Sequence, residues 1–371
     1  MHVVLGCYVT PDDGPTARDC RHGGLVAAEL DALGIHPGDV LDVSVNVNPY
    51  GPCPAVRDTI ARAALERYPD PSAAPARRSA ARWLGVPDER VVLGNGAVDI
   101  LWLLARTALG RGDVVMTVEP TFSEMREAAR CVGARVEAHH TDPQRDFALD
   151  PAALDASIAE HRPRVVYACM PSNPAGRWTP PSVFVDLAER HPETLFVVDL
   201  SFLSLSTHAT ETPWRGSAKI VWLRSLTKDH ALAGLRVGCA VAPAEVVERL
   251  EAARPPWSVN AFAQEAITAI ASPGADDFVA TARARLLADR LALEEGLRML
   301  AVRTIPSETV FLLADLGARS AASVRTAMLR DHRVLVRDGS SFGLPHHIRL
   351  AARPAEDTKR LLAALASVLG R

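Results

Sequence analysis

Short apolar runs alternate with amphipathic stretches from about Arg90 onward, and this alternation constrains the fold more than any other feature of the sequence. The runs are RVVLG (90–94), DVVMTVEP (113–120), RVVYACMP (164–171), LFVVDLS (195–201), AKIVWLRS (218–225) and RVGCAVAP (236–243). The intervening segments 97–109, 121–134 and 180–191 have helical patterns. Continuously apolar strands are typical of parallel sheets covered by helices. The sequence therefore predicts an α/β fold with a large, mostly parallel sheet sandwiched by helices.

The pattern changes after RPPW (254–257). A long helical segment (276–300) is followed by strand candidates at 307–316, 333–339 and 346–352, which indicates a smaller α+β domain. A chain of 371 residues also exceeds the length that one core usually serves. We predict a large domain over 48–255, a small C-terminal domain over 256–371, and an N-terminal segment (1–47) that packs on the small domain.

Charge and composition exclude several kinds of partner. A net charge of -3 gives no reason to expect nucleic acid or an anionic membrane. The N-terminus lacks the pattern of a signal peptide, and no stretch is apolar and long enough to span a bilayer. The six cysteines are scattered without metal-ligand spacing. We therefore expect a cytoplasmic protein with free thiols and no metal.

Polar residues follow several of the predicted strands. Asn173 lies just beyond RVVYAC, Asp199 ends LFVVD, and two glycines lead from RVVL into a helix near Ala97. Ligands bind at the carboxyl ends of strands in open parallel sheets, and the start of a helix can bind an anion. Each feature has an ordinary alternative, namely turn chemistry, a salt bridge or cap, and a simple strand-to-helix turn.

Lys228 lies in the segment RSLTKDHALAGLRVG (224–238), which is dense in phosphate-binding groups. Ser225 and Thr227 offer hydroxyls, and Arg236 offers a guanidinium. A lysine beside such a site can form a Schiff base. The alternative is a solvated loop.

Taken in order, the glycine-rich turn, Asn–Pro–x–Gly, the strand-end aspartate and Ser–x–Thr–Lys with a later arginine resemble the fold-type-I aminotransferases that depend on pyridoxal 5'-phosphate. The resemblance covers nearly the whole chain. Within this superfamily, the sequence looks most like threonine-phosphate decarboxylase and, next, histidinol-phosphate aminotransferase. The motifs behind this reading are HGG (22–24), DVSVNVNPYGP (42–52), RYPDP (67–71), PTFSE (120–124), PPWSVN (255–260) and VLVRDGSSFGL (334–344).

The resemblance implies that the predicted large domain binds the cofactor. Lys228 would hold it as a Schiff base, and Asp199 would pair with its pyridine nitrogen. Asn173 would bond the ring oxygen and Phe122 would stack on the ring. The cofactor phosphate would be held by Ala97, Val98, Ser225, Thr227 and Arg236, and by Tyr68 of a neighbouring subunit, which implies a homodimer with shared sites.

The resemblance also implies the substrate. Arg349 would bind its α-carboxylate, and Arg337 would bind a phosphate with help from His22 and Asn48. Our first expectation is therefore a lyase that decarboxylates O-phospho-L-threonine in cobalamin biosynthesis. The alternative is an aminotransferase acting on histidinol phosphate or a similar amino acid with 2-oxoglutarate. A cofactor-binding regulator is a third reading, against which the intact lysine, aspartate and arginines argue.

One position departs from the superfamily pattern. Aminotransferases usually carry a tyrosine three residues after the strand-end aspartate, and this chain has Phe202 there. The loss of one donor to the ring oxygen favours the decarboxylase reading over transamination.

Overall fold

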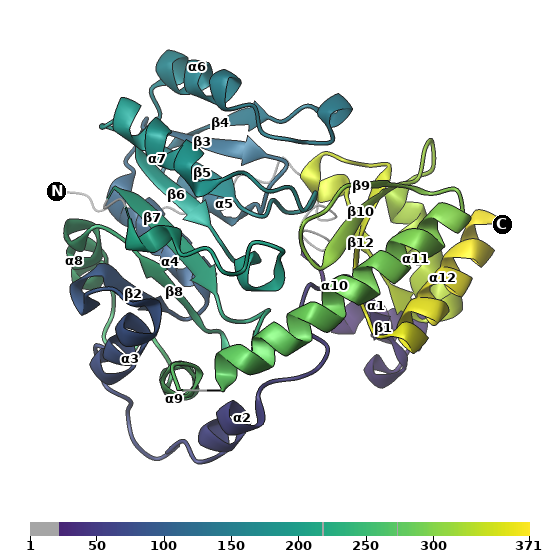
Figure 1. Cartoon of the computed structure of the whole chain (residues 1–371), viewed down its shortest axis with the longest axis horizontal. Coiled ribbons are helices and arrows are strands. Elements are labelled where there is room, and N and C mark those ends of the chain that lie inside the picture. Colours follow the sequence, from purple (N-terminus) through teal and green to yellow (C-terminus); the bar gives the residue numbers. More distant parts are fainter. Residues whose placement is uncertain (1–21, 217–218, 273) are drawn as a thin grey trace.

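The computed structural model describes residues 22–216, 219–272 and 274–371, so the prediction for residues 1–21 lies outside the described residues. Two lobes lie side by side, and the long helix α10 (Ala275–Met299) runs from one to the other (Figure 1). The larger lobe contains a wide central sheet, and the smaller lobe combines the C-terminal part of the chain with the N-terminal segment. Among the described residues, no helix is long and apolar enough to cross a membrane.

The large sheet has seven strands in the order β2-β8-β7-β6-β5-β3-β4. All of its pairings are parallel except the two made by β8, so the predicted α/β class with a mostly parallel sheet is confirmed. The apolar runs correspond to six of these strands. The seventh strand, β4, is polar and was not predicted from an apolar run. The strands are β2 (Val91–Gly94), β3 (Val114–Glu119), β4 (Arg135–His140), β5 (Val165–Cys169), β6 (Leu195–Asp199), β7 (Ile220–Ser225) and β8 (Gly238–Val241).

Helices cover both faces of this sheet because its strands are apolar on both sides. Along β5, Val166 packs into one core and Tyr167 into the other. The first core is shared with α3 (Ala74–Leu84), α6 (Pro151–His161) and α7 (Pro181–Arg190). The second core is shared with α4 (Ala97–Ala108), α5 (Glu124–Cys131) and α8 (Ala244–Ala253).

The small lobe is built on an antiparallel sheet in the order β12-β13-β10-β9. Its strands are β9 (Arg303–Ile305), β10 (Phe311–Asp315), β12 (Arg337–Asp338) and β13 (His347–Ala351). Packed with this sheet are α10, α11 (Ala321–His332) and α12 (Ala355–Leu369). The N-terminal segment joins this lobe, because β1 (Leu41–Asp42) pairs with β11 (Val334–Leu335) and α1 (Ala27–Leu33) packs there through Leu30.

Helix α9 (Ala261–Ile270) lies with the large lobe. It contacts α2 (Pro54–Ala61) and α3, and Ile267 and Ile270 are buried in the first core. The predicted domain boundary between residues 255 and 256 therefore separates α9 from the helices on which it packs. The helical pattern of 261–270 gave no information about which lobe its apolar face would join.

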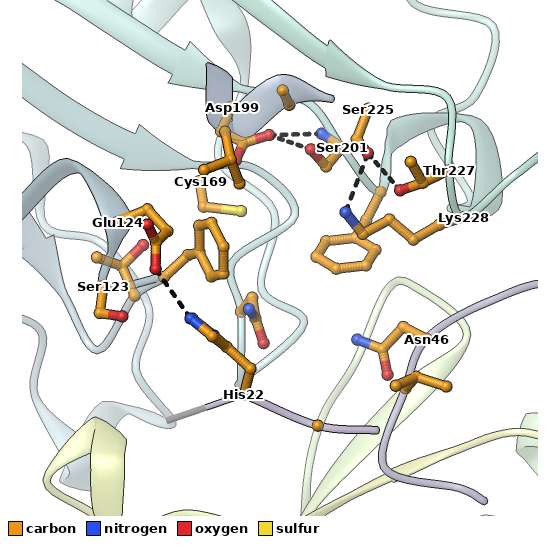
Figure 2. Close-up of a pocket in the computed structure, with 18 of the residues that line it drawn as sticks. His22, Asn46, Ser123, Glu124, Cys169, Asp199, Ser201, Ser225, Thr227 and Lys228 are labelled. Atoms are coloured by element: carbon orange, nitrogen blue, oxygen red, sulfur yellow. Dashed lines mark hydrogen bonds and ion pairs between the residues drawn. The ribbon is translucent and has the colours of Figure 1, made fainter. Parts of the chain in front are cut away.

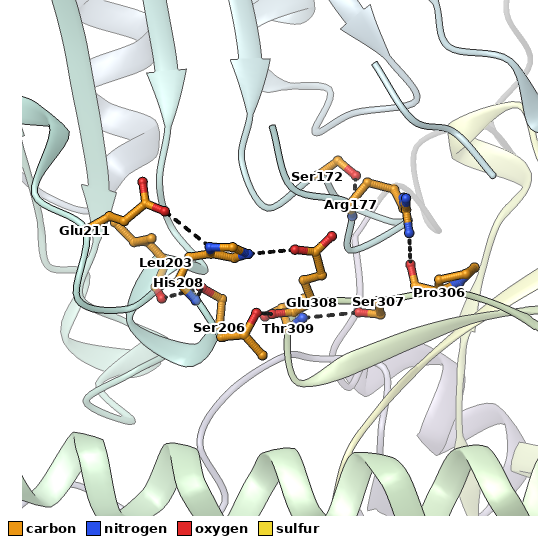
Figure 3. Close-up of polar contacts among 11 residues, drawn as sticks. Ser172, Arg177, Leu203, Ser206, His208, Glu211, Pro306, Ser307, Glu308 and Thr309 are labelled. Carbon is orange, nitrogen blue, oxygen red and sulfur yellow. Dashed lines mark hydrogen bonds and ion pairs between the residues drawn. The ribbon is translucent and has the colours of Figure 1, made fainter. Parts of the chain in front are cut away.

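A loop of the small lobe, residues 306–309, forms hydrogen bonds with two loops of the large lobe (Figure 3). The backbone N–H of Glu308 donates to the carbonyl of Gly176 (2.9 Å), and the carbonyl of Glu308 accepts from the N–H of Thr207 (3.0 Å). The Glu308 side chain contacts His208 at 2.7 Å. These two loops follow β5 and β6, so one segment links the ends of both strands to the small lobe. We call residues 306–309 the clasp.

Candidate active site

A pocket of about 440 Å³ opens where the carboxyl ends of the large-sheet strands face β12 and β13 of the small lobe (Figure 2). The large lobe supplies most of its wall. The small lobe supplies Arg337, Ser341, Phe342 and Arg349, and the N-terminal segment supplies His22, Gly23 and residues 44–47. Each lobe and the N-terminal segment thus contribute side chains to one cavity.

Lys228 follows β7 and lines the pocket. Its Nζ donates to Ser225 Oγ at 3.0 Å, and this hydroxyl is 2.7 Å from Thr227 Oγ1 (Figure 2). Burial lowers the pKa of Lys228, and the nearby Asp199 carboxylate partly opposes that shift. A lysine whose amine loses its proton more readily than usual is suited to attack a carbonyl carbon.

Asp199, at the end of β6, is 4% exposed and has three hydrogen-bond donors. Its Oδ1 accepts from the backbone N–H (2.9 Å) and hydroxyl (2.5 Å) of Ser201, and its Oδ2 accepts from the Tyr167 hydroxyl at 2.9 Å. Burial raises the pKa of Tyr167 well above its usual value, so that hydroxyl remains a donor. The carboxylate is therefore fixed in orientation and faces the pocket that Lys228 lines.

A place for a phosphate lies at the start of α4, where Ala97 and Val98 line the pocket. Gly96 precedes the helix with φ +88°, and a Cβ on it would lie 2.8 Å from Arg236 Nη2. A Cβ on Gly238 would lie 2.5 Å from the Ala97 nitrogen. Both glycines therefore leave the first backbone N–H groups of the helix open beside a guanidinium, which is what an anion requires. With Lys228 and Asp199, this arrangement fits a phosphorylated pyridine aldehyde.

Arg337 and Arg349 lie directly opposite each other on the antiparallel strands β12 and β13. They are 3% and 6% exposed, and both line the pocket. Arg349 donates to Asn173 Oδ1 (2.5 Å) and to the carbonyl of Ser44 (2.5 Å), while its Nε has no partner in the described structure. Burial, and then the charge of Arg337, lower the pKa of Arg349 to about 9. Two buried like charges in one wall indicate a site for an anionic ligand.

Three further predicted residues lie at the pocket. Phe122 and Asn173 line it, and Asn173 is tied to Arg349 across the two lobes. Phe202, which replaces the usual tyrosine, is buried with its ring centre 5.7 Å from Lys228 Nζ. This ring offers an apolar face and no hydroxyl.

His22 reaches the pocket because glycine follows it. A Cβ on Gly23 would lie 2.4 Å from the carbonyl oxygen of Ser44, and the N–H of Gly24 donates to Ser44 Oγ at 2.8 Å. The HGG motif therefore lets the chain approach Ser44 closely. His22 Nε2 then lies 2.8 Å from Glu124 Oε1, and its ring centre lies 5.3 Å from that of Phe122.

Two predicted residues lie outside the pocket. Asn48 is buried, donates to the carbonyl of Asp229 (3.1 Å) and accepts from the N–H of Tyr50 (3.0 Å), so it supports the Lys228 loop. Asn46 lines the pocket in its place, and neither of its amide atoms has a partner in the described structure. Tyr68 is 83% exposed and lies against Trp257, with ring centres 5.1 Å apart.

Sequence reasoning missed Tyr167, Ser201, Glu124 and Asn46 as site residues. Tyr167 lies inside an apolar run, and only the pairing of β5 with β6 brings its hydroxyl to Asp199. Ser201 and Glu124 belong to segments quoted above, LFVVDLS and PTFSE, in which a polar residue near the end of a strand was a usable signal.

Comparison with known proteins shows which family this chain is similar to. A family model described as "Aminotransferase class I and II" matches residues 38–365. A histidinol-phosphate aminotransferase of Symbiobacterium thermophilum is 33% identical, with 91% of this chain and 92% of that protein covered. The crystal structure of histidinol-phosphate aminotransferase from Sinorhizobium meliloti in complex with pyridoxal-5'-phosphate has a TM-score of 0.85 at 22% identity, covering 94% and 95%. L-threonine-O-3-phosphate decarboxylase from Porphyromonas gingivalis has a TM-score of 0.78 at 25% identity, covering 90% and 100%.

These comparisons correct our first expectation of a lyase acting on O-phospho-L-threonine in cobalamin biosynthesis. The curated relative that matches nine-tenths of the chain is named an aminotransferase, and the decarboxylase is a more distant neighbour. Two of the motifs that suggested the lyase contain residues that shape the backbone. HGG allows the approach to Ser44, and Asn260 of PPWSVN caps α9 through the N–H of Ala263. Neither motif decides which bond of a substrate breaks.

Proposed function

Because the chain belongs to the aminotransferase class I and II family, we propose that it transfers an amino group between histidinol phosphate, or a similar phosphorylated amine, and 2-oxoglutarate. The cofactor is pyridoxal 5'-phosphate. When bound, it supplies a carbonyl carbon that takes up the substrate amine and a ring that accepts the electrons of the bond that breaks. The names of the relatives support the choice of histidinol phosphate.

The opposed pair of Arg337 and Arg349 carries the proposal. Histidinol phosphate has a phosphate and no carboxylate, whereas 2-oxoglutarate has two carboxylates and no phosphate. Both compounds must enter one pocket in turn, and both present an oxyanion that a guanidinium can bind in a bidentate manner. A wall with two adjacent arginines serves a dianionic phosphate in one half of the reaction and a carboxylate in the other.

Lys228 would move the proton. Burial lowers the pKa of its amine, so the neutral form that accepts a proton is available closer to neutral pH than in an exposed lysine. Once the substrate amine has displaced it, this amine would take the proton from the substrate Cα and return it to the cofactor carbon. Ser225 Oγ, 3.0 Å from Nζ, would hold the amine between transfers.

Asp199 would keep a proton on the ring nitrogen of the cofactor. The donors Tyr167 and Ser201 fix its carboxylate and occupy lone pairs on both oxygens. The open amides of Ala97 and Val98, with Arg236, would hold the cofactor phosphate, and Phe122 would cover the ring. Asn173 would bond the ring oxygen.

The proposal includes a homodimer. Tyr68 does not line the pocket of its own chain, and 83% of its surface is exposed. A phenol in that position would bind the cofactor phosphate of a second copy. Mixing inactive Lys228→Ala with inactive Tyr68→Ala subunits should restore part of the activity, since one hybrid site then has both residues. No recovery after verified subunit exchange would count against a shared site.

The function is tested with the purified holoenzyme. Histidinol phosphate with 2-oxoglutarate should yield glutamate, and histidinol, which lacks the phosphate, should react far more slowly. O-phospho-L-threonine is the matched comparison, with release of CO2 as the readout. Failure to form glutamate from histidinol phosphate, with other amino donors active, would refute the proposed substrate.

A further inference from the structure

The pocket is lined by carboxylates as well as by arginines, and we call its edge at Glu124 the acidic rim. Two carboxylates line the pocket among the described residues, Asp199 and Glu124. Asp199 is held by Tyr167 and Ser201 at the end of β6. Glu124 begins α5 and points toward His22 (Figure 2). The side chain of Glu124 is 16% exposed. Its Oε2 accepts from Trp102 Nε1 at 2.8 Å, which fixes the carboxylate from behind.

Neither the cofactor nor an anionic group of the substrate explains Glu124. A carboxylate repels phosphate and carboxylate, and the arginines of the pocket, Arg236, Arg337 and Arg349, lie on other elements. A partly buried acid that faces a binding pocket is complementary to an N–H donor or a cation there. The ligand complementary to this pocket therefore has an anionic end for the arginines and an N–H end for Glu124.

A histidine of the chain itself shows which kind of side chain can bind at the acidic rim. The imidazole of His22 lies with Nε2 at 2.8 Å from Glu124 Oε1 and tilts over the Phe122 ring at 45°. The side chain of His22 is 48% exposed, so it is attached to the rim mainly through this contact. Glu124, Phe122 and Trp102 thus form a place that already holds an imidazole ring.

We propose that Glu124 is the residue that selects the imidazole ring of the substrate, and that His22 occupies this place until the substrate ring replaces it. The inference rests on the proposed function, because histidinol phosphate is the ligand with a phosphate at one end and an imidazole at the other. The imidazole N–H donates to the Glu124 carboxylate, and its face packs on Phe122. Glu124 is a specificity residue and takes no part in the proton transfer at Lys228.

The first experiment measures binding without turnover. Two amine-free phosphates are titrated into the holoenzyme by calorimetry: 3-(imidazol-4-yl)propyl phosphate, and propyl phosphate, which lacks the ring. In the Glu124→Gln variant, the amide oxygen still accepts the hydrogen bond but carries no charge, so the imidazole compound should bind about threefold to thirtyfold more weakly. Propyl phosphate should bind unchanged. Glu127→Gln, one turn further along α5 and paired with Arg130 at 3.1 Å, is the matched control and should alter neither.

The second experiment uses His22→Ala. If His22 holds the place of the substrate ring, its removal takes away one partner of the Glu124 carboxylate, and the imidazole compound should bind several-fold more tightly. Weaker binding would show that His22 helps to bind the ligand and would overturn the exchange. Propyl phosphate again serves as the ring-free reference.

The outcomes separate this inference from the proposed function. Turnover of histidinol phosphate tests the function, whereas the calorimetric comparison needs no turnover. Equal losses for both phosphates in Glu124→Gln would mean that Glu124 only supports the pocket, and the inference would fall while the function stood. Equal binding of both phosphates by the wild type would overturn the inference in the same way. Ring-dependent binding without turnover would leave the imidazole site standing and refute the aminotransferase reaction.

Discussion

Replacing Arg337 with methionine should cost the ligand-free protein less stability than the loss of another buried arginine, and it should weaken ligand binding. Arg337 and Arg349 are directly paired across β12 and β13, and both are buried. Side chains opposite each other on antiparallel strands begin about 5 Å apart, and two unit charges at that distance repel by about 3 kcal/mol at an effective dielectric constant of about 20. The charge of Arg337 is the second cause, after burial, of the lowered pKa of Arg349.

The expected effect on stability follows from the contacts that Arg337 makes. Methionine keeps the apolar contact with Phe342, over whose ring the guanidinium lies at 5.0 Å, and loses the hydrogen bond to Ser341. A neutral hydrogen bond contributes about 1 kcal/mol and a charged one about 1.5–3. Relief of the repulsion therefore offsets the lost hydrogen bond, so Arg337→Met should lower the unfolding temperature by less than the loss of a buried arginine that has no like charge beside it. Histidinol phosphate should bind about tenfold to a hundredfold more weakly.

The assay is thermal unfolding of the holoenzyme, with and without propyl phosphate. Arg353→Met is the matched control, because Arg353 is also buried but donates to the carbonyls of Asp42, Val45 and Ala352. Its loss leaves those acceptors unpaired and should lower the unfolding temperature. If Arg337→Met lowers the unfolding temperature as much as Arg353→Met, repulsion between the paired arginines is not a significant cost, and the argument for a built anion site loses its basis.

Three further predictions concern the cofactor. Lys228→Ala should lose the visible absorbance of the bound cofactor and nearly all turnover; the chain has three lysines, and borohydride trapping on Lys219 or Lys359 would contradict the assignment. Asp199→Asn should move the pH midpoint of cofactor uptake by the apoenzyme downward, because the carboxylate opposes the lowering of the Lys228 pKa by burial, and an upward shift would oppose this reasoning. Gly238→Ala should weaken cofactor retention on dialysis, since its Cβ would lie 2.5 Å from the Ala97 nitrogen, whereas Gly234→Ala, with nothing within 4 Å, should retain it.

Local sequence pattern was enough for the central sheet and for much of the pocket. Six strands are apolar on both faces, so their runs stand out, and Asp199 and Asn173 follow directly from the ends of two of them. Lys228 was identifiable because hydroxyls and an arginine surround it in the sequence. These features depend on neighbours within a few residues.

Features that depend on distant contacts were not predictable in this way. Asn46 and Asn48 are the same residue type two positions apart, yet one lines the pocket and the other bonds the carbonyl of Asp229. The α9 helix joins the large lobe because α2 and α3 present its partners. The reaction itself was misjudged because motifs such as HGG, whose glycines allow a close approach to Ser44, do not decide which bond of a substrate breaks.

The clasp at residues 306–309 has a consequence for exchanging lobes between relatives. Its links to the carbonyl of Gly176 and to the N–H of Thr207 run through the backbone of Glu308, so they do not depend on the side chain at position 308. The restriction falls on Gly176, where a Cβ would lie 2.2 Å from Ser307 Oγ and the backbone has φ +73°. A chimera that takes its small lobe from another member of the family should therefore assemble if position 176 remains glycine, even when the clasp residues themselves differ.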